Sequence, residues 1–190
     1  MSRAAAHHFS NNLRYRDPDD PGQTQLTPAY ILGPVRADLR GMIGLDPCTT
    51  ADNPVGALCC YTQDDDGLAC RWGGWDGAGR WAPTVFCNPP YGKAREPWVD
   101  RCIEAGERGQ QVILLMPAAT DTRIFQKAVS TATAVVFIRG RVKFGVLRPN
   151  RRQAAASHPS ALIGWNTNLS ACSHLGLWMR AETGCLEAAS

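Results

Sequence analysis

A motif behind a short apolar segment holds the residue types that could orient an amine. The segment Thr84–Cys87 predicts a buried strand, and Asn88, Pro89, Pro90 and Tyr91 follow it directly. The Asn88 side-chain oxygen and the Pro89 carbonyl can each accept a hydrogen bond from an amino group. The two prolines fix φ and remove two backbone donors, so the turn is stiff, and Tyr91 offers a flat face for stacking. These four candidate catalytic residues suit methyl transfer to a ring-conjugated amino nitrogen. The alternative is a plain turn in which Pro-Pro ends the strand and the asparagine caps it.

The composition is that of an ordinary globular protein. The chain has 190 residues, of which 44% are hydrophobic and 19% charged, which suits one domain with a real core. We expect a flexible N-terminal arm at residues 1–22, a single domain at 23–180 and a C-terminal tail at 181–190. No apolar segment is long enough to span a membrane. The polar N-terminus lacks an apolar signal core, which predicts an intracellular protein.

The cysteines and histidines do not predict a metal site. Eight cysteines and four histidines are present, but no C-x-x-C pair and no histidine pair with ligand spacing occurs among them. We therefore expect no metal.

Continuous apolar segments alternate with helical patterns, and this predicts an α/β fold. Strands are expected at residues 42–45, 59–62, 84–87, 111–116, 134–138, 160–165 and 175–179, and helices at 27–39, 97–107 and 120–129. Thr27 before Pro28 is typical of a helix cap. Unbroken apolar strands indicate a mostly parallel sheet with helices on both faces. Ligands bind beyond the carboxyl ends of such strands, where Asp46, Pro47 and the motif residues would lie.

Basic residues cluster late in the chain. They are Arg139, Arg141, Lys143, Arg148, Arg151 and Arg152. The first three alternate along an extended segment and could face one side, where they would contact phosphates. The alternatives are a solvated basic loop, or pairing of the first three with Asp121 or another acid.

An ordered series of motifs resembles the phage-type DNA N6-adenine methyltransferases, the Dam family of phages and prophages. The matching features are Thr27-Pro28, Leu45-Asp46-Pro47, Asp66-Gly67-Leu68 with Trp72, Phe86–Gly92, Pro97-Trp98-Val99, Leu114–Ala118 with Thr120-Asp121-Thr122, Arg139-Gly140-Arg141, and Lys143-Phe144. They cover roughly residues 25–165.

The resemblance implies a Rossmann-like class I methyltransferase sheet and S-adenosylmethionine as cofactor. Carried over by position, Asp46, Pro47, Thr27 and Asp66 would lie in the cofactor pocket. It also implies a phage- or prophage-encoded enzyme that methylates adenine at specific DNA sites in the cytoplasm of a bacterial host. One departure stands out, because residues 48–54 replace the glycine-rich loop that most enzymes of this fold carry after the first strand.

The expected reaction takes the adenine out of the duplex, because its amino nitrogen cannot reach a methyl donor inside the base stack. Other acceptors stay open, namely cytosine N4, RNA adenine and the side-chain amide of a protein glutamine. A non-catalytic nucleic-acid-binding relic of the fold is the alternative from a different class, since the glycine-rich loop is missing.

Overall fold

The computed structural model describes residues 26–73, 84–90, 94–145, 155–182 and 185–188. Its helices and strands are α1 (Ala29–Asp38), β1 (Leu45–Asp46), β2 (Cys59–Cys60), the 3-10 turn η3 (Gln63–Asp65), β3 (Thr84–Cys87), α2 (Arg95–Glu107), β4 (Gln111–Pro117), α3 (Arg123–Thr131), β5 (Ala134–Ile138), β6 (Ser160–Trp165), the 3-10 turn η4 (Ser173–Leu175), β7 (Gly176–Glu182) and β8 (Cys185–Ala188).

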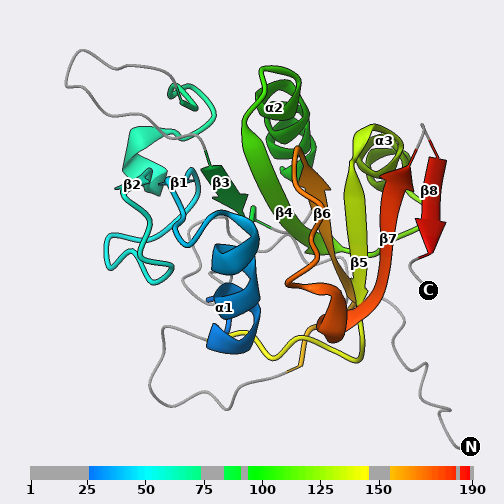
Figure 1. Ribbon diagram of the computed structural model, residues 1–190. Coiled ribbons are helices and arrows are strands. Elements are labelled where there is room, and N and C mark those ends of the chain that lie inside the picture. The colour runs from blue at the N-terminus through cyan, green and yellow to red at the C-terminus, as the bar shows by residue number, and fades with distance from the viewer. Residues whose placement is uncertain (1–25, 74–83, 91–93, 146–154, 183–184, 189–190) are drawn as a thin grey trace, which may run out of the picture.

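The strands form one mixed sheet in the order β2-β1-β3-β4-β6-β5-β7-β8 (Figure 1). Neighbours from β2 to β4 are parallel, whereas each neighbouring pair from β4 to β8 is antiparallel. The α/β class is confirmed, but the prediction of a mostly parallel sheet is wrong. The cause is two strands: β6 inserts between β4 and β5 in the opposite direction, with Val112 opposite Trp165 and Pro117 opposite Ser160, and β7 is antiparallel to both β5 and β8. A strand buried on both faces is apolar in either direction, so its apolar pattern does not reveal how it pairs.

Helices cover both faces of the sheet, and alternate strand residues point to each face. On one face, Val85 and Leu114 pack in a core with Trp98 of α2 and Phe125 of α3. On the other, Phe86 packs with Ile31 and Val35 of α1 and with further strand residues. Figure 1 shows α2 and α3 together, away from α1. The sheet is therefore the rigid layer on which any site at the strand ends is built.

The sheet continues past residue 180. β7 extends to Glu182, and β8 pairs with it, with Met179 opposite Ala188. The expected domain boundaries stay a prediction. Within the described ranges, no helix combines the length and the apolar character that crossing a membrane requires.

Candidate active site

The chain changes direction across the sheet at β1. From β1 it passes to β2 on one side, and it then returns to β3 on the other side of β1. Crevices open at such switch points beyond the carboxyl ends of parallel strands. Asp46 is the last residue of β1, and Asn88 directly follows β3. The structure therefore brings the predicted cofactor residue and the predicted catalytic residue to neighbouring strand ends.

Asp46 and Asn88 also belong to the same face. Leu45 is opposite Val85, and both pack in the core under α2, whereas Phe86 packs under α1. Because side chains alternate along a strand, Asp46 falls on the α1 face, and so does Asn88. Asp46 and Asn88, which would bind the cofactor and the acceptor, thus lie on the same face of the sheet at the ends of two neighbouring strands.

Thr27 holds the Asn88 side chain. The Asn88 Nδ2 atom donates to the Thr27 Oγ1 atom at 3.1 Å, and Thr27 is buried. The predicted role of Thr27 as the cap of α1 is wrong, because the helix begins after Pro28 and no side chain caps it. The contact joins residues 61 positions apart, so no local pattern could have predicted it.

The rest of the motif is only partly described. Pro89 is buried and Pro90 is exposed, so the turn emerges from the core at the second proline. Tyr91 lies outside the described residues.

Asp46 is a buried carboxylate, only 3% exposed. Burial raises its pKa from the ordinary 3.8 to about 6, although hydrogen bonds from the Cys48 backbone and the Thr49 side chain act in the opposite direction. The Cys48 N–H lies 3.2 Å from Oδ1. Among the residues that the structure describes, no cationic side chain forms an ion pair with Asp46. Within the described part of the chain, the Asp46 carboxylate therefore has hydrogen-bond donors but no cationic partner.

Pro47 and Asp66 are brought together by a close backbone contact. Gly67 passes so near the Pro47 carbonyl that a Cβ on Gly67 would collide with that oxygen. The Trp72 indole N–H donates to the Gly67 carbonyl at 2.7 Å, and Trp72 packs 6.1 Å from the Trp98 ring of α2. This contact places the exposed Asp66 beside the end of β1. The sequence showed Asp66-Gly67 with the nearby Trp72 as a motif. It did not show that Gly67 contacts the Pro47 carbonyl.

We expect Gly67→Ala to destabilise the protein by about 1–3 kcal/mol, the usual cost of overpacking, and to weaken cofactor binding. Gly33→Ala is the matched control, because a Cβ there meets no atom within 4 Å on α1. An alanine in an exposed helix position stabilises by up to about 1 kcal/mol relative to glycine. Urea denaturation measures both changes, and equal stability of the two variants would contradict the close approach.

Two thiols, one half-buried and one buried, lie next to the site residues Asp46 and Asn88. Cys48 and Cys87 have their sulfur atoms 3.7 Å apart, and a hydrogen bond from the Asn88 backbone reaches the Cys48 sulfur. Burial raises the pKa of both thiols above the ordinary value. Both groups therefore stay protonated at neutral pH and pack as small apolar side chains between the Asp46 segment and the motif.

The first three predicted basic residues are exposed. Arg139, Arg141 and Lys143 face solvent, while Val142 and Phe144 between and beside them are buried, as alternation along an extended segment predicts. Arg141 donates to the carbonyl oxygen of Ser157, so part of its hydrogen-bonding capacity serves the protein itself. Arg148, Arg151 and Arg152 lie outside the described residues.

This basic segment is tied to the residue before Thr27. Leu26 and Gly145 form an antiparallel bridge, with N–H to carbonyl distances of 3.1 and 2.9 Å. The exposed Lys143 is thus two residues away from the strand pair that positions Thr27. The end of the basic segment and the motif therefore both contact the residues that directly precede α1.

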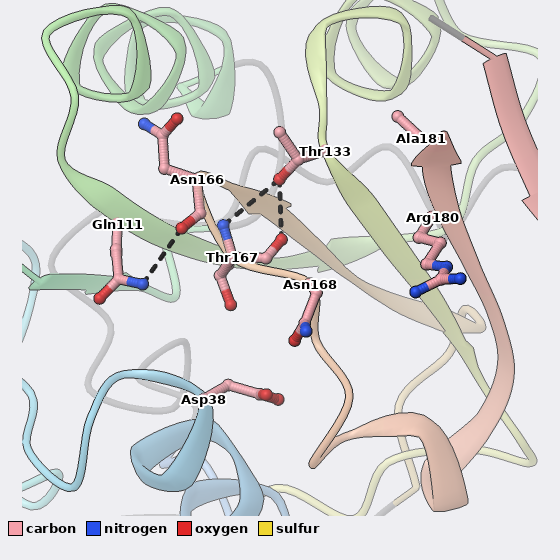
Figure 2. A pocket seen from close by; sticks show the side chains of 8 residues that line it. All are labelled: Asp38, Gln111, Thr133, Asn166, Thr167, Asn168, Arg180 and Ala181. Atoms are coloured by element: carbon pink, nitrogen blue, oxygen red, sulfur yellow. Dashed lines mark hydrogen bonds between the residues drawn. The ribbon is translucent and has the colours of Figure 1, made fainter. Parts of the chain in front are cut away.

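A pocket of about 470 Å³ opens at the opposite ends of the strands from Asn88, near the start of β4 and the end of β6. Its polar groups bind one another, as Figure 2 shows: Gln111 Nε2 donates to the Asn166 carbonyl, and Thr133 Oγ1 donates to the Thr167 carbonyl. These bonds hold strand ends together. The pocket is far along the strands from Asn88, and we assign it no part in the chemistry.

One of three comparisons with known proteins found a match. A family model described as DNA N-6-adenine-methyltransferase (Dam) matches residues 18–175. Comparison with the curated proteins and with the solved structures found no match. The match spans β1, the motif, the basic segment and β6, which includes every part of the candidate site described above. The chain belongs to the DNA N-6-adenine-methyltransferase (Dam) family.

Proposed function

We propose that the protein transfers the methyl group of S-adenosylmethionine to N6 of an adenine that has been rotated out of DNA. The observation that carries this proposal is the placement of Asp46 and Asn88 on one face, at neighbouring strand ends where the sheet connections diverge. In this proposal the sheet is a variant of the Rossmann-like class I methyltransferase sheet. Its support is the parallel block β2-β1-β3-β4, which carries the site at its carboxyl ends.

The residues around Asp46 fit a cationic cofactor. A carboxylate that is 3% exposed and has no ion pair within the described ranges suits an ammonium group or ribose hydroxyls. Pro47 and Asp66, which the approach of Gly67 to the Pro47 carbonyl brings together, are further candidates for the pocket. When bound, S-adenosylmethionine supplies an electrophilic methyl group on a sulfonium sulfur.

The motif residues hold the acceptor. Asn88 Oδ1 accepts one N–H of the adenine amino group, and the Pro89 carbonyl accepts the other, so the nitrogen lone pair is directed away from the ring plane. The stiff Pro-Pro turn keeps these two acceptors in place, and positioning of this kind supplies much of the acceleration. Asn88 is neutral and cannot act as a strong base, so the released proton passes to water. Tyr91 stacks on the extruded base.

The exposed basic residues bind the DNA backbone in this proposal. Arg139, Arg141 and Lys143 contact phosphates beside the motif, and Arg148, Arg151 and Arg152 are further candidates for DNA contact. The support is the bridge between Leu26 and Gly145, which fixes the basic segment next to Thr27 and hence next to Asn88.

We expect the double variant Arg139→Gln, Lys143→Gln to weaken DNA binding and to flatten its dependence on salt. Each lost phosphate contact lowers the slope of log affinity against log salt by about 0.9. Arg108→Gln is the control, because this exposed arginine pairs with Glu104 at the far end of α2. Fluorescence anisotropy across a salt series measures the slopes. An unchanged slope in the double variant would remove these residues from the interface.

The proposed function is tested by methyl transfer from radiolabelled S-adenosylmethionine to separate acceptors. Duplex DNA, single-stranded DNA, RNA and protein are offered in parallel, and labelled DNA is digested to nucleosides to distinguish N6-methyladenine from N4-methylcytosine. Label in N6-methyladenine supports the proposal. Label found only in RNA, protein or cytosine would show that adenine in DNA is not the acceptor. A chain that binds the cofactor and DNA without transfer, or that fails to bind the cofactor, would indicate the non-catalytic alternative.

A further inference from the structure

We propose that Thr27 is a positioning residue that holds the Asn88 side chain where its amide oxygen can face the adenine. The inference deepens the proposed function and rests on it. The family resemblance associates Thr27 with the cofactor pocket, whereas the structure bonds its hydroxyl to the catalytic asparagine.

The two ends of an asparagine amide have opposite hydrogen-bonding character. The NH₂ end only donates and the oxygen only accepts. An adenine amino group also presents N–H donors, so only the oxygen end of Asn88 can hold it. A reversed amide would set two donors against each other.

The contact with Thr27 fixes the position of the Asn88 side chain. Asn88 Nδ2 lies 3.1 Å from Thr27 Oγ1, and Thr27 is 8% exposed, so water competes little for the hydroxyl. With the nitrogen end held by Thr27, the oxygen is directed to the other side of the amide. A hydroxyl beside the asparagine therefore acts on the reaction without touching either substrate.

Thr27 and Asn88 both lie next to rigid parts of the fold. Thr27 lies between Leu26, which pairs with Gly145 through two backbone hydrogen bonds, and Pro28, whose carbonyl accepts the first bonds of α1. That helix is anchored by Ile31 and Val35, both fully buried. Asn88 follows β3, whose four residues are all buried. The hydroxyl can therefore hold a fixed direction, as a positioning group must.

The test compares Thr27→Val with Thr27→Ser in the full-length chain. Valine keeps the shape and removes the hydroxyl, while serine restores it. Loss of one neutral hydrogen bond corresponds to about a tenfold lower kcat for methyl transfer. We expect Thr27→Val to show this loss with an unchanged dissociation constant for S-adenosylmethionine, and Thr27→Ser to recover most of the rate.

Thr84→Val is the matched control. Thr84 is buried at the opposite end of β3, where its hydroxyl donates to the Met42 carbonyl and accepts from the Gly44 N–H. This variant loses hydrogen bonds of the same kind, so we expect a lower melting temperature with an unchanged kcat.

A second background tests whether Thr27 acts through Asn88. In Asn88→Ala the amide that Thr27 holds is absent. The rate that remains in Asn88→Ala should fall by less than about threefold when Thr27→Val is added, since coupled neighbours are not additive. The same tenfold loss in both backgrounds, or a weaker cofactor affinity that accounts for the loss, would overturn the positioning role.

The two proposals fail in different ways. A wild-type chain that methylates adenine while Thr27→Val keeps the full kcat would overturn the role of Thr27 alone. A wild-type chain that transfers no methyl group to adenine would overturn the proposed function, and the role of Thr27 with it.

Discussion

Asn88→Ala is expected to reduce methyl transfer by at least about a hundredfold, the scale of losing one preorganised hydrogen-bonding group at a reacting centre. The affinity for S-adenosylmethionine should stay within about threefold of the wild type, because Asn88 acts on the acceptor. Single-turnover transfer to duplex DNA measures the rate, and calorimetry measures cofactor binding. The loss should also exceed that of Thr27→Val, because the indirect effect cannot exceed removal of the group through which it acts.

Asn166→Ala is the control for the loss of asparagine hydrogen bonds. Its Nδ2 atom donates to the carbonyl oxygens of Gly106 and Gln110, and its φ of +54° is unfavourable for alanine. We expect this variant to lose more stability than Asn88→Ala and yet to keep its kcat. Equal activity of Asn88→Ala and the wild type would show that the motif is not the acceptor site.

Asp46→Asn is expected to stabilise the cofactor-free protein and to weaken S-adenosylmethionine binding at the same time. A pKa of about 6 in the folded protein against an ordinary 3.8 corresponds to a cost of about 3 kcal/mol for the charged form at neutral pH. Asparagine removes this cost. Loss of a buried charge partner weakens cofactor binding by two orders of magnitude or roughly 3 kcal/mol. Urea denaturation and calorimetry measure the two opposite effects.

The raised pKa of Asp46 also predicts how protein stability and cofactor affinity depend on pH. The folded state holds this proton more tightly than the unfolded state, so its ionisation lowers stability as the pH rises from about 4 to 6. The cofactor ammonium requires the carboxylate, so its affinity should fall about tenfold per pH unit below pH 6. Both pH dependences should be absent in Asp46→Asn.

Asp38→Asn is the matched carboxylate control. Asp38 accepts hydrogen bonds from the backbone N–H groups of Ala171 and Cys172, each at 3.0 Å, and lies at the pocket at the opposite ends of the strands. Its replacement should lower stability and leave cofactor affinity unchanged. An Asp46→Asn variant that also loses stability would show that the buried carboxylate does not carry the proposed cost.

The sequence by itself determined several helices and strands, the family, and the stiffness of the motif. Thr84–Cys87, Arg95–Glu107 and Ala134–Ile138 form as strand, helix and strand because apolar periodicity and Pro or Gly boundaries are local properties. The series of motifs from Thr27 to Phe144 was sufficient for the family, which the match over residues 18–175 confirms. The stiffness of Asn88-Pro89-Pro90 is likewise a local property, because it follows from the proline rings.

Only the tertiary structure decided the strand pairing and the partners of the site residues. The antiparallel insertion of β6 between β4 and β5 is invisible in a strand that is apolar on both faces. The Asn88–Thr27 bond, the bridge between Leu26 and Gly145, and the approach of Gly67 to Pro47 join segments far apart in the chain. Local patterns report which backbone conformation a segment prefers, whereas the contacts between segments depend on how all of them pack at once.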